Sequence, residues 1–222
     1  MNCPKCKSDQ VYCIDSRQIK VERRRKYECV RCKTRFRTVE TVIEINEKGD
    51  ENTMKTTNGK GVPKPGEKFE YNGQKFIALG LEQGGLLAIA EKPIGDMPFD
   101  EDGRADWRTA SLRSYLNGDY LKKLGEGDLM PFTSDLTADD GMKDYGTTED
   151  YVFLLSDALY RKYRDVIPRF RTWWWTITPW SCLPSYASNE RNVYTSGALS
   201  NRDATVTYGV VPSLLFNLQS FE

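Results

Sequence analysis

Two pairs of cysteines near the start of the chain, Cys3-x-x-Cys6 and Cys29-x-x-Cys32, constrain its fold more than any other feature. Each pair places two thiolates on one tight turn. The 22 residues between the pairs allow two hairpin turns to meet around one tetrahedral Zn²⁺. Four sulfur ligands leave no position for water or substrate, so we expect one structural zinc ion. Two redox-active or disulfide pairs are the alternative, but no secretory signal precedes the cysteines and both pairs lie in polar, basic sequence.

Composition sets the size and class of the protein. The 222 residues suffice for one full-sized domain and a small one, and 39% hydrophobic residues support a real core. No apolar run approaches the roughly 18 residues that a membrane helix needs, so we expect no membrane partner and a cytoplasmic protein. Residues 1–48 hold 13 Lys and Arg against 7 Asp and Glu, whereas the remainder carries a net charge of −6.

The chain contains no histidine. This absence excludes Ser-His-Asp and Cys-His catalysis and histidine metal ligands, and it removes the usual proton shuttle near neutral pH. Cys13 and Cys182 stand outside the two pairs and are interpreted as small buried thiols, with a reactive nucleophile or a fifth metal ligand as the alternative. We therefore expect a protein that is not an enzyme.

The sequence predicts an α+β protein with three parts: a zinc ribbon over residues 1–48, a flexible linker over 49–66 and a larger domain over 67–222. In the ribbon, alternation over 39–45 predicts a strand. In the larger domain we expect mostly antiparallel strands and two short helices, at 111–116 with Ser111 as cap and at 157–163 with Ser156 as cap. Asn72-Gly73 and Gly84-Gly85 predict hairpin turns, 125–150 a long acidic loop, and 152–155 and 210–218 buried strands.

Basic residues between and after the cysteine pairs predict one strongly positive face on the ribbon, because so small a module cannot disperse them. Contact with phosphates is the physical use that fits, and a solvated face or a protein-docking surface is the alternative. Tyr27 and Phe36 could stack on bases, but we expect them to fill the small core. The candidate nucleic-acid contacts are Arg17, Arg23, Arg24, Arg25, Lys26, Arg35 and Arg37.

The ribbon resembles a known family over residues 1–45. The matching segments are Asn2-Cys3-Pro4-x-Cys6, Ile14-Asp15-Ser16-Arg17, Arg23 through Cys29-x-x-Cys32, and Arg35-Phe36-x-Thr38-x-Glu40. They resemble the zinc ribbon of the bacterial ribonucleotide-reductase repressor family, NrdR. The resemblance implies that the ribbon binds DNA through its arginine run. That family's nucleotide-sensing domain does not follow here, so we do not expect nucleotide-controlled repression.

Three segments of the larger domain carry a second resemblance, over about residues 67–220. They are Leu112-Arg113-x-Tyr115-Leu116-Asn117, Asp150 to Ser156, and a stretch from Trp173-Trp174-Trp175 to Gly209-Val210-Val211-Pro212. They resemble an uncharacterised domain of bacteria and phages related to the C-type-lectin-like fold of formylglycine-generating enzymes and retroelement-diversified proteins. The resemblance implies a lectin-like binding domain encoded by a phage or mobile element. Formylglycine-generating chemistry needs a pair of thiols, and this domain offers only Cys182.

Residues 181–209 have the composition of a recognition surface, since 14 of the 29 are Ser, Thr, Asn or Tyr. An ordinary polar loop is the alternative. Trp174 is expected in the core, and its neighbours less so, because consecutive strand residues alternate faces. Acidic residues of 135–150 could bind Ca²⁺, against the alternative of a solvated loop. The candidate ligand contacts are Trp173, Trp175, Tyr186, Asn189, Asn192, Tyr194, Asn201 and Tyr208.

Together these features predict a non-enzymatic binding protein with a zinc ribbon that contacts nucleic acid and a lectin-like domain that binds a protein or glycan. Two alternatives stay open. In one, the protein is a virion or receptor-binding protein whose ribbon is purely structural. In the other, it is a transcriptional regulator that uses the larger domain as sensor or dimeriser.

Overall fold

The computed structural model describes residues 4–8, 10–19, 22–41 and 61–221, and only the backbone for strand residues 12–19, 22–25 and 37–41. The chain folds into two compact units, Met1–Asn52 and Thr53–Glu222, called here the ribbon and the body. Most of the segment expected as a linker lies outside the described residues. Its last part, residues 61–66, bonds to the body: the Gly66 amide donates to the Ala78 carbonyl at 2.8 Å.

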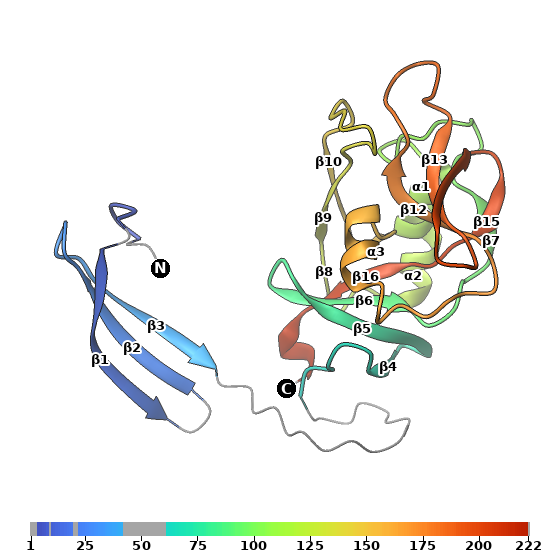
Figure 1. The fold of residues 1–222 in the computed structure, drawn as a ribbon. Coiled ribbons are helices and arrows are strands. Elements are labelled where there is room, and N and C mark those ends of the chain that lie inside the picture. The colour runs from blue at the N-terminus through green and yellow to red at the C-terminus, as the bar shows by residue number, and fades with distance from the viewer. Residues whose placement is uncertain (1–3, 9, 20–21, 42–60, 222) are drawn as a thin grey trace. The chain divides into compact units, whose positions relative to one another are not determined.

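The ribbon is a three-stranded antiparallel sheet in the order β1-β2-β3 (Figure 1). Its register shifts between Cys13 and Asp15, where a bulge interrupts the pairing of β1 with β2. The strand expected over 39–45 is present at its start, but it begins earlier, and residues 42–45 lie outside the described residues. The bounds are β1 (Val11–Ile19), β2 (Glu22–Cys29) and β3 (Arg35–Thr41).

The first sheet of the body has the order β11-β16-β6-β5-β4, with β8 also paired to β16, and all its pairs are antiparallel. All six residues of β6 and all four of β16 are buried, which explains their continuous apolar sequences. The bounds are β4 (Lys68–Tyr71), β5 (Gln74–Glu82), β6 (Gly85–Ala90), β8 (Leu129–Met130), β11 (Val152–Phe153) and β16 (Ser213–Phe216).

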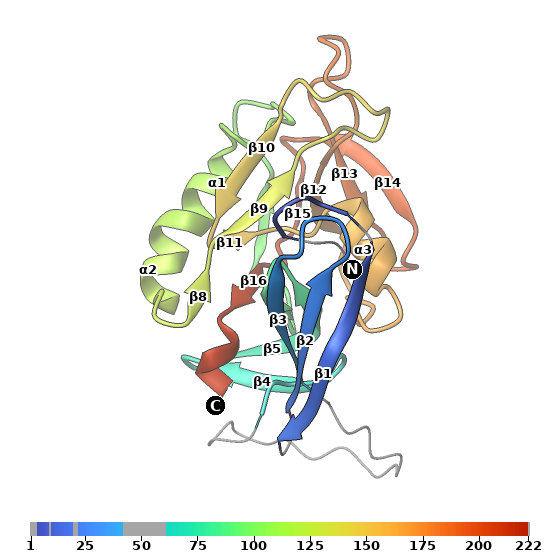
Figure 2. The same cartoon turned by 90° about the vertical axis from the view of Figure 1, so that its left-hand side faces the viewer.

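The second sheet has the order β14-β13-β12-β15-β7 and lies apart from the first in both views (Figures 1 and 2). Its pairs are antiparallel except for β12 with β15, which run parallel. Three of its strands lie within the segment 181–209, whose composition indicated polar loops. The expectation of loops is wrong for these strand residues. The bounds are β7 (Asp96–Pro98), β12 (Trp174–Pro179), β13 (Asn189–Val193), β14 (Leu199–Asp203) and β15 (Thr207–Gly209).

A two-stranded hairpin, β9 (Phe132–Asp135) with β10 (Thr147–Asp150), occupies most of the segment expected as an acidic loop. Burial alternates along both strands, and Phe132 stacks on Phe153 with ring centroids 4.2 Å apart. The hairpin forms because one face of each strand has apolar neighbours, a condition that the acidic composition of the segment does not reveal.

Two helical segments fall where the sequence predicts them. The first is continuous and consists of α1 (Ser111–Tyr115), a π-helical turn η1 (Leu116–Tyr120) and α2 (Leu121–Leu124). The second is α3 (Asp157–Tyr163), capped as expected by Ser156, whose hydroxyl accepts from the Leu159 amide at 3.2 Å. Within residues 168–221 the structure adds only a short 3₁₀ turn, η2 (Leu218–Phe221).

The predicted cap at Ser111 is wrong. Ser111 is itself the first helical residue, and its amide donates to the Asp100 carboxylate at 2.9 Å. The same carboxylate accepts from the Arg104 amide at 2.9 Å. A loop residue eleven positions earlier therefore satisfies the helix end, and local sequence cannot reveal such a partner.

Glycine residues with positive φ form the turns, and one turn lies one residue earlier than predicted. Asn72 and Gly73 join β4 to β5, and both have positive φ, 47° and 79°, as a type I′ turn requires. The next turn consists of Gln83 and Gly84, with φ of 44° and 84°, rather than the predicted Gly84-Gly85. Gly85 instead begins β6, where an added Cβ would lie 2.7 Å from the Phe216 carbonyl oxygen. The close approach of the β16 backbone therefore explains why residue 85 is a glycine.

A buried ion pair attaches α3 to the second sheet. The Arg191 guanidinium of β13 donates to the Asp157 carboxylate at 2.9 Å, and the Thr176 hydroxyl of β12 donates to the same group at 2.9 Å. Both charged side chains are more than nine-tenths buried. Because a buried charge needs its partner, this pair sets where α3 lies on β12, next to the ring contact of Tyr160 with Trp174.

Together these elements confirm the α+β expectation of mostly antiparallel strands with two short helices beside a small ribbon. Among the described residues, no helix is long and apolar enough to cross a membrane.

Candidate functional site

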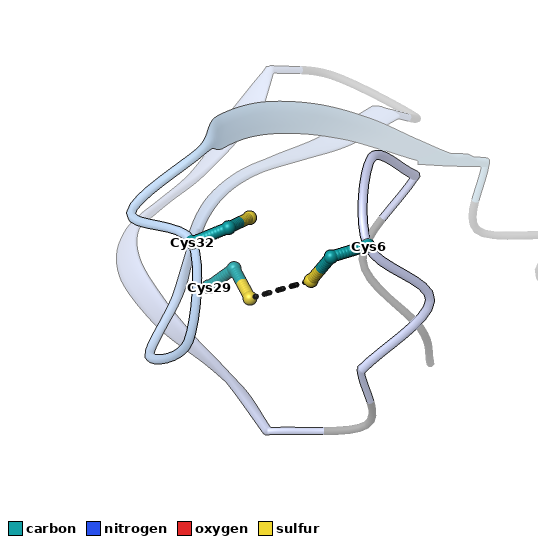
Figure 3. Close-up of side chains that lie close together, drawn as sticks. All are labelled: Cys6, Cys29 and Cys32. Atoms are coloured by element: carbon teal, nitrogen blue, oxygen red, sulfur yellow. Dashed lines mark hydrogen bonds between the residues drawn. The ribbon is translucent and has the colours of Figure 1, made fainter.

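Three thiols of the ribbon gather at one point. Cys6 lies on the turn before β1, Cys29 ends β2 and Cys32 lies on the turn that follows (Figure 3). Their sulfur atoms lie within 4.8 Å of one another, and the sulfurs of Cys6 and Cys29 are 3.6 Å apart. That separation is far too long for a disulfide of about 2.05 Å. It agrees with the roughly 3.8 Å between sulfurs bound tetrahedrally to zinc at about 2.3 Å.

The backbone of the two turns explains how each positions its thiols. The residue after each pair's second cysteine, Lys7 or Lys33, has left-handed φ, 59° and 56° respectively. In the second turn the Lys33 amide donates to the Cys29 carbonyl at 2.9 Å, and the Cys29 amide donates to the Thr34 carbonyl at 3.0 Å. Equivalent backbone bends thus follow Cys6 and Cys32.

The thiols present fit a zinc ion. Cys29 is fully buried and the other two are half-buried, so the donor set is largely shielded from water. Cys3, the fourth predicted ligand, lies outside the described residues, as does the side chain of Cys13. The three described thiols would bind the ion, which would replace the apolar core that so small a sheet lacks.

A small aromatic contact supports the same sheet. Tyr27 of β2 and Phe36 of β3 lie opposite each other in register, and their rings stack with centroids 5.7 Å apart. Tyr27 is only 8% exposed. The expectation that these rings fill the ribbon core, rather than stack on bases, is therefore confirmed for Tyr27, with Phe36 half-buried beside it.

The backbone register brings basic residue types together across the three strands. Arg17 of β1 lies opposite Arg24 of β2, and Lys26 of β2 lies opposite Arg37 of β3. Arg23 and Arg25 occupy register positions on the same strand, opposite Gln18 and Ser16. Lys26 also lies opposite Asp15 of β1, and Arg23 lies opposite Glu40 of β3, so acidic positions are interspersed with the basic ones. The described backbone therefore concentrates these predicted contacts on one sheet.

Lys26 and Arg35 are the two candidate contacts of the ribbon whose side chains are described. Both are exposed, and Arg35 retains 74% of its side-chain exposure while pairing with Glu28 at 2.7 Å. An exposed pair of this kind is weak.

The acidic residues of 135–150 serve local structure. Asp135 accepts from Thr137, Asp140 from the Met142 amide, and Asp150 from Trp107 and Arg113. Among the described residues, the cysteines form the one group of three or more possible metal ligands. The Ca²⁺ hypothesis therefore receives no support from these carboxylates.

In the body, three of the predicted ligand contacts form one partly exposed aromatic cluster. Trp173 stacks on Tyr194 with centroids 4.1 Å apart, and Tyr208 lies 5.3 Å from Trp173. Arg202 of β14, which is not among the predicted contacts, lies over the rings of Trp173 and Tyr194 at 5.4 and 5.8 Å. The pairing of β13 with β14 brings it there, and no local motif indicates that pairing. Stacked rings and a guanidinium form a surface that suits planar or ring-shaped groups.

Two predicted ligand contacts are wrong because the structure buries them. Trp175 is fully buried and donates to the Met97 carbonyl at 3.0 Å. Asn192 is also fully buried, directly opposite Trp175 in the pairing of β12 with β13. The body thus uses both Trp174 and Trp175 as core residues, since each face of this central strand is covered.

The remaining predicted contacts lie elsewhere on the body. Tyr186 is 49% exposed and belongs to the turn before β13, where the Asn189 amide donates to the Tyr186 carbonyl at 2.9 Å. Asn201 is half-buried on β14. Among the described residues, Tyr186 makes no ring contact with the aromatic cluster, so the structure does not unite the eight predicted contacts in one site.

One comparison with known proteins gives a match. The family model described as the N-terminal domain of transcriptional repressor NrdR-like proteins matches residues 1–40. No curated protein and no solved structure matches the chain. The match covers the cysteine turns and all three ribbon strands except the last residue of β3. The N-terminal unit is therefore a zinc ribbon of the NrdR type with a cysteine site for one zinc ion.

Proposed function

We propose that this protein is a non-enzymatic, two-domain binding protein whose zinc ribbon contacts DNA and whose body binds a protein or glycan ligand. The observation that carries the proposal is the backbone register of the ribbon sheet, which places Arg17 opposite Arg24 and Lys26 opposite Arg37. Phosphates are the natural partners of such paired cations, because each contact also releases counterions from the nucleic acid.

The family match supports the DNA-binding part of the proposal, because the matched model is named for transcriptional repressors. The same name favours a second candidate function, a transcriptional regulator in which the body acts as sensor or dimeriser. The two functions differ in one measurable property. A regulator prefers one DNA sequence, whereas contact through phosphates alone discriminates little between sequences.

For the body, the proposal is a C-type-lectin-like domain encoded by a phage or mobile element and acting in the cytoplasm. Its support is the sequence resemblance over residues 67–220 and the half-exposed cluster of Trp173, Tyr194, Tyr208 and Arg202. Aromatic and guanidinium groups of this kind are typical of recognition surfaces.

The chemistry of the titratable groups supports a non-enzymatic role. The chain has no histidine, so the commonest general base is missing. Burial raises the pKa of the Cys182 thiol above its ordinary value, which keeps the thiol protonated near neutral pH and makes it a poor nucleophile.

Fluorescence anisotropy of the full chain with labelled duplex DNA tests the DNA-binding proposal. The logarithm of the binding constant should fall linearly with the logarithm of salt concentration, with a slope of about −0.9 for each phosphate contacted. Replacing Arg24 and Arg25 by alanine should weaken binding and flatten the slope by about 2. The matched control is K122A/K123A, which removes two exposed lysines of the body.

Zinc content of each variant shows that the ribbon is still folded. Equal weakening by the ribbon and body variants, or binding of the wild type that is insensitive to salt, would contradict DNA contact by the ribbon. Competition with unlabelled DNA of random sequence separates the two candidate functions, since only a regulator retains a preferred sequence under that competition.

A further inference from the structure

The body contains a cavity of about 250 Å³ where the loop after α3 meets the end of β13. The loop segment 164–170 forms one side. Trp174 of β12, Val193 and Tyr194 close the other, together with Gly197 from the following turn. This volume is below the range of about 300–1,000 Å³ typical of pockets for drug-sized ligands, so the cavity suits a single ring.

Three aromatic side chains pack together behind the lining of the cavity. Tyr160 and Phe170 each make an edge-to-face contact with Trp174, at 5.5 and 5.6 Å between centroids. All three side chains are at least nine-tenths buried, and the Tyr160 hydroxyl donates to the Gly197 carbonyl at 2.9 Å. The cavity is therefore preformed, and the surface that it offers to a ligand is mostly polar, which suits a ring that carries hydroxyl groups.

Two guanidinium groups, Arg164 and Arg169, line the same cavity. Both are exposed, and neither pairs with a carboxylate among the described residues, whereas Arg108, Arg113, Arg161 and Arg191 all do. The Arg164 guanidinium lies over the Tyr160 ring, 5.8 Å from its centroid. Asp165 is the one carboxylate in the described lining, so the cations outnumber it.

The phenol of Tyr160 is close enough to both cations to respond to them. Burial raises its pKa, and the charges of Arg164 and Arg169 oppose that rise. Both guanidinium groups line the same cavity, and guanidinium groups bind carboxylates and phosphates through paired hydrogen bonds.

We propose that this cavity binds a small ring compound that carries a carboxylate or a phosphate, with its anion on Arg164 and Arg169 and the hydroxyl groups of its ring against the polar lining. The inference rests on the proposed ligand-binding role of the body and narrows it to acidic ligands. The carboxylate of an acidic sugar and the phosphate of a sugar ester offer the same chemistry, and titration with one compound of each kind separates them.

Isothermal titration calorimetry of the full chain with glucuronate, glucose 6-phosphate, glucose and inorganic phosphate provides the test. We expect one of the two acidic rings to bind, and glucose and inorganic phosphate to bind at least about tenfold more weakly, because each lacks one of the two interactions. The stronger acidic ring identifies the source of the anion.

Variants locate that binding. R164A and R169A should each weaken it by about tenfold, the loss expected for one charge-assisted hydrogen bond. R171A removes a neighbouring exposed cation that does not line the cavity, so it serves as the matched control and should change little. D165N should tighten binding, because it removes the carboxylate from the lining without changing its shape. All four positions are exposed, so folding should be unaffected.

Three results would overturn the inference: no binding of either acidic ring, equal affinity for glucose, or acidic-ring affinity unchanged in R164A/R169A. The last result would place the anion elsewhere, on the ribbon for example. A neutral glycan or protein that still binds the body of R164A/R169A would leave the broader proposed function intact. If the wild type binds no acidic ring, neutral glycan or protein, both this inference and the proposed ligand-binding role of the body are wrong.

Discussion

Glu190 offers the sharpest test of how the body is built. It lies on β13 with none of its surface exposed, and neither carboxylate oxygen has a hydrogen-bond partner among the described residues. Burial raises its pKa well above the ordinary value, since the charged form cannot be solvated there. The folded protein therefore holds this proton at pH values where the unfolded chain has released it.

The sign of the effect on stability follows from that difference in bound protons. When the folded state binds more protons, the free energy of unfolding falls as pH rises. The contribution of Glu190 to stability is fully present below the ordinary carboxyl pKa. It is lost as the pH rises through the raised pKa of the folded protein. While the folded state holds one more proton than the unfolded chain, the free energy of unfolding falls by about 1.4 kcal/mol for each pH unit. The substitution E190Q, which keeps the shape and cannot ionise, should abolish this contribution.

Urea unfolding at pH 5, 6 and 7 measures the effect. All five tryptophans of the chain belong to the body, so their fluorescence reports its unfolding separately from that of the ribbon. We expect E190Q to match the wild type most closely at pH 5 and to exceed it by a growing margin at pH 6 and 7. E126Q replaces an exposed carboxylate and is the control. A margin that stays constant with pH, or an E190Q protein less stable at pH 7, would refute the reasoning.

Two further predictions concern the metal and a glycine. Cys29→Ser, or a strong chelator, should unfold the ribbon and reduce bound zinc from about one equivalent to a small fraction. The tryptophan fluorescence of the body should stay native. If the circular dichroism signal of the ribbon survives chelation, that result would count against the metal centre. Gly85→Ala should destabilise the body by about 1–3 kcal/mol, because the added methyl group would meet a backbone carbonyl oxygen at 2.7 Å. Gly118→Ala is the control, because its new methyl group has no atom within 4 Å and the residue lies in a helical segment. This variant should leave the stability of the body unchanged or raise it by up to about 1 kcal/mol. If thermal unfolding shows Gly118→Ala to be less stable than Gly85→Ala, the close approach of Gly85 to Phe216 is wrong.

Features governed by short-range chemistry could be predicted from the sequence. The Asn72-Gly73 turn has the positive φ values expected of it, and Ser156 caps α3. The cysteine spacing indicated the zinc site, because two short turns need only their own residues to present thiols. Each of these depends on contacts within a few positions of the chain.

Features that depend on the partner of a strand could not be predicted in this way. The segment 181–209 has loop composition, yet β13 lies inside a five-stranded sheet, and this position buries Asn192 and Glu190. The turn at Gln83-Gly84 is displaced by one residue because Gly85 is needed where β6 approaches β16. Arg202 reaches the aromatic cluster only through the pairing of β14 with β13.

The amino-acid sequence by itself therefore determined the metal-binding turns, the basic strands of the ribbon and the division into a small sheet and a larger α+β body. The tertiary structure alone decided which tryptophans are core, which carboxylate is buried without a partner among the described residues, and where Arg164 and Arg169 line one cavity. The physical reason is that turns, caps and metal ligands are satisfied by neighbours in the chain. Burial and cavities arise from segments that pack together only after the whole body has folded.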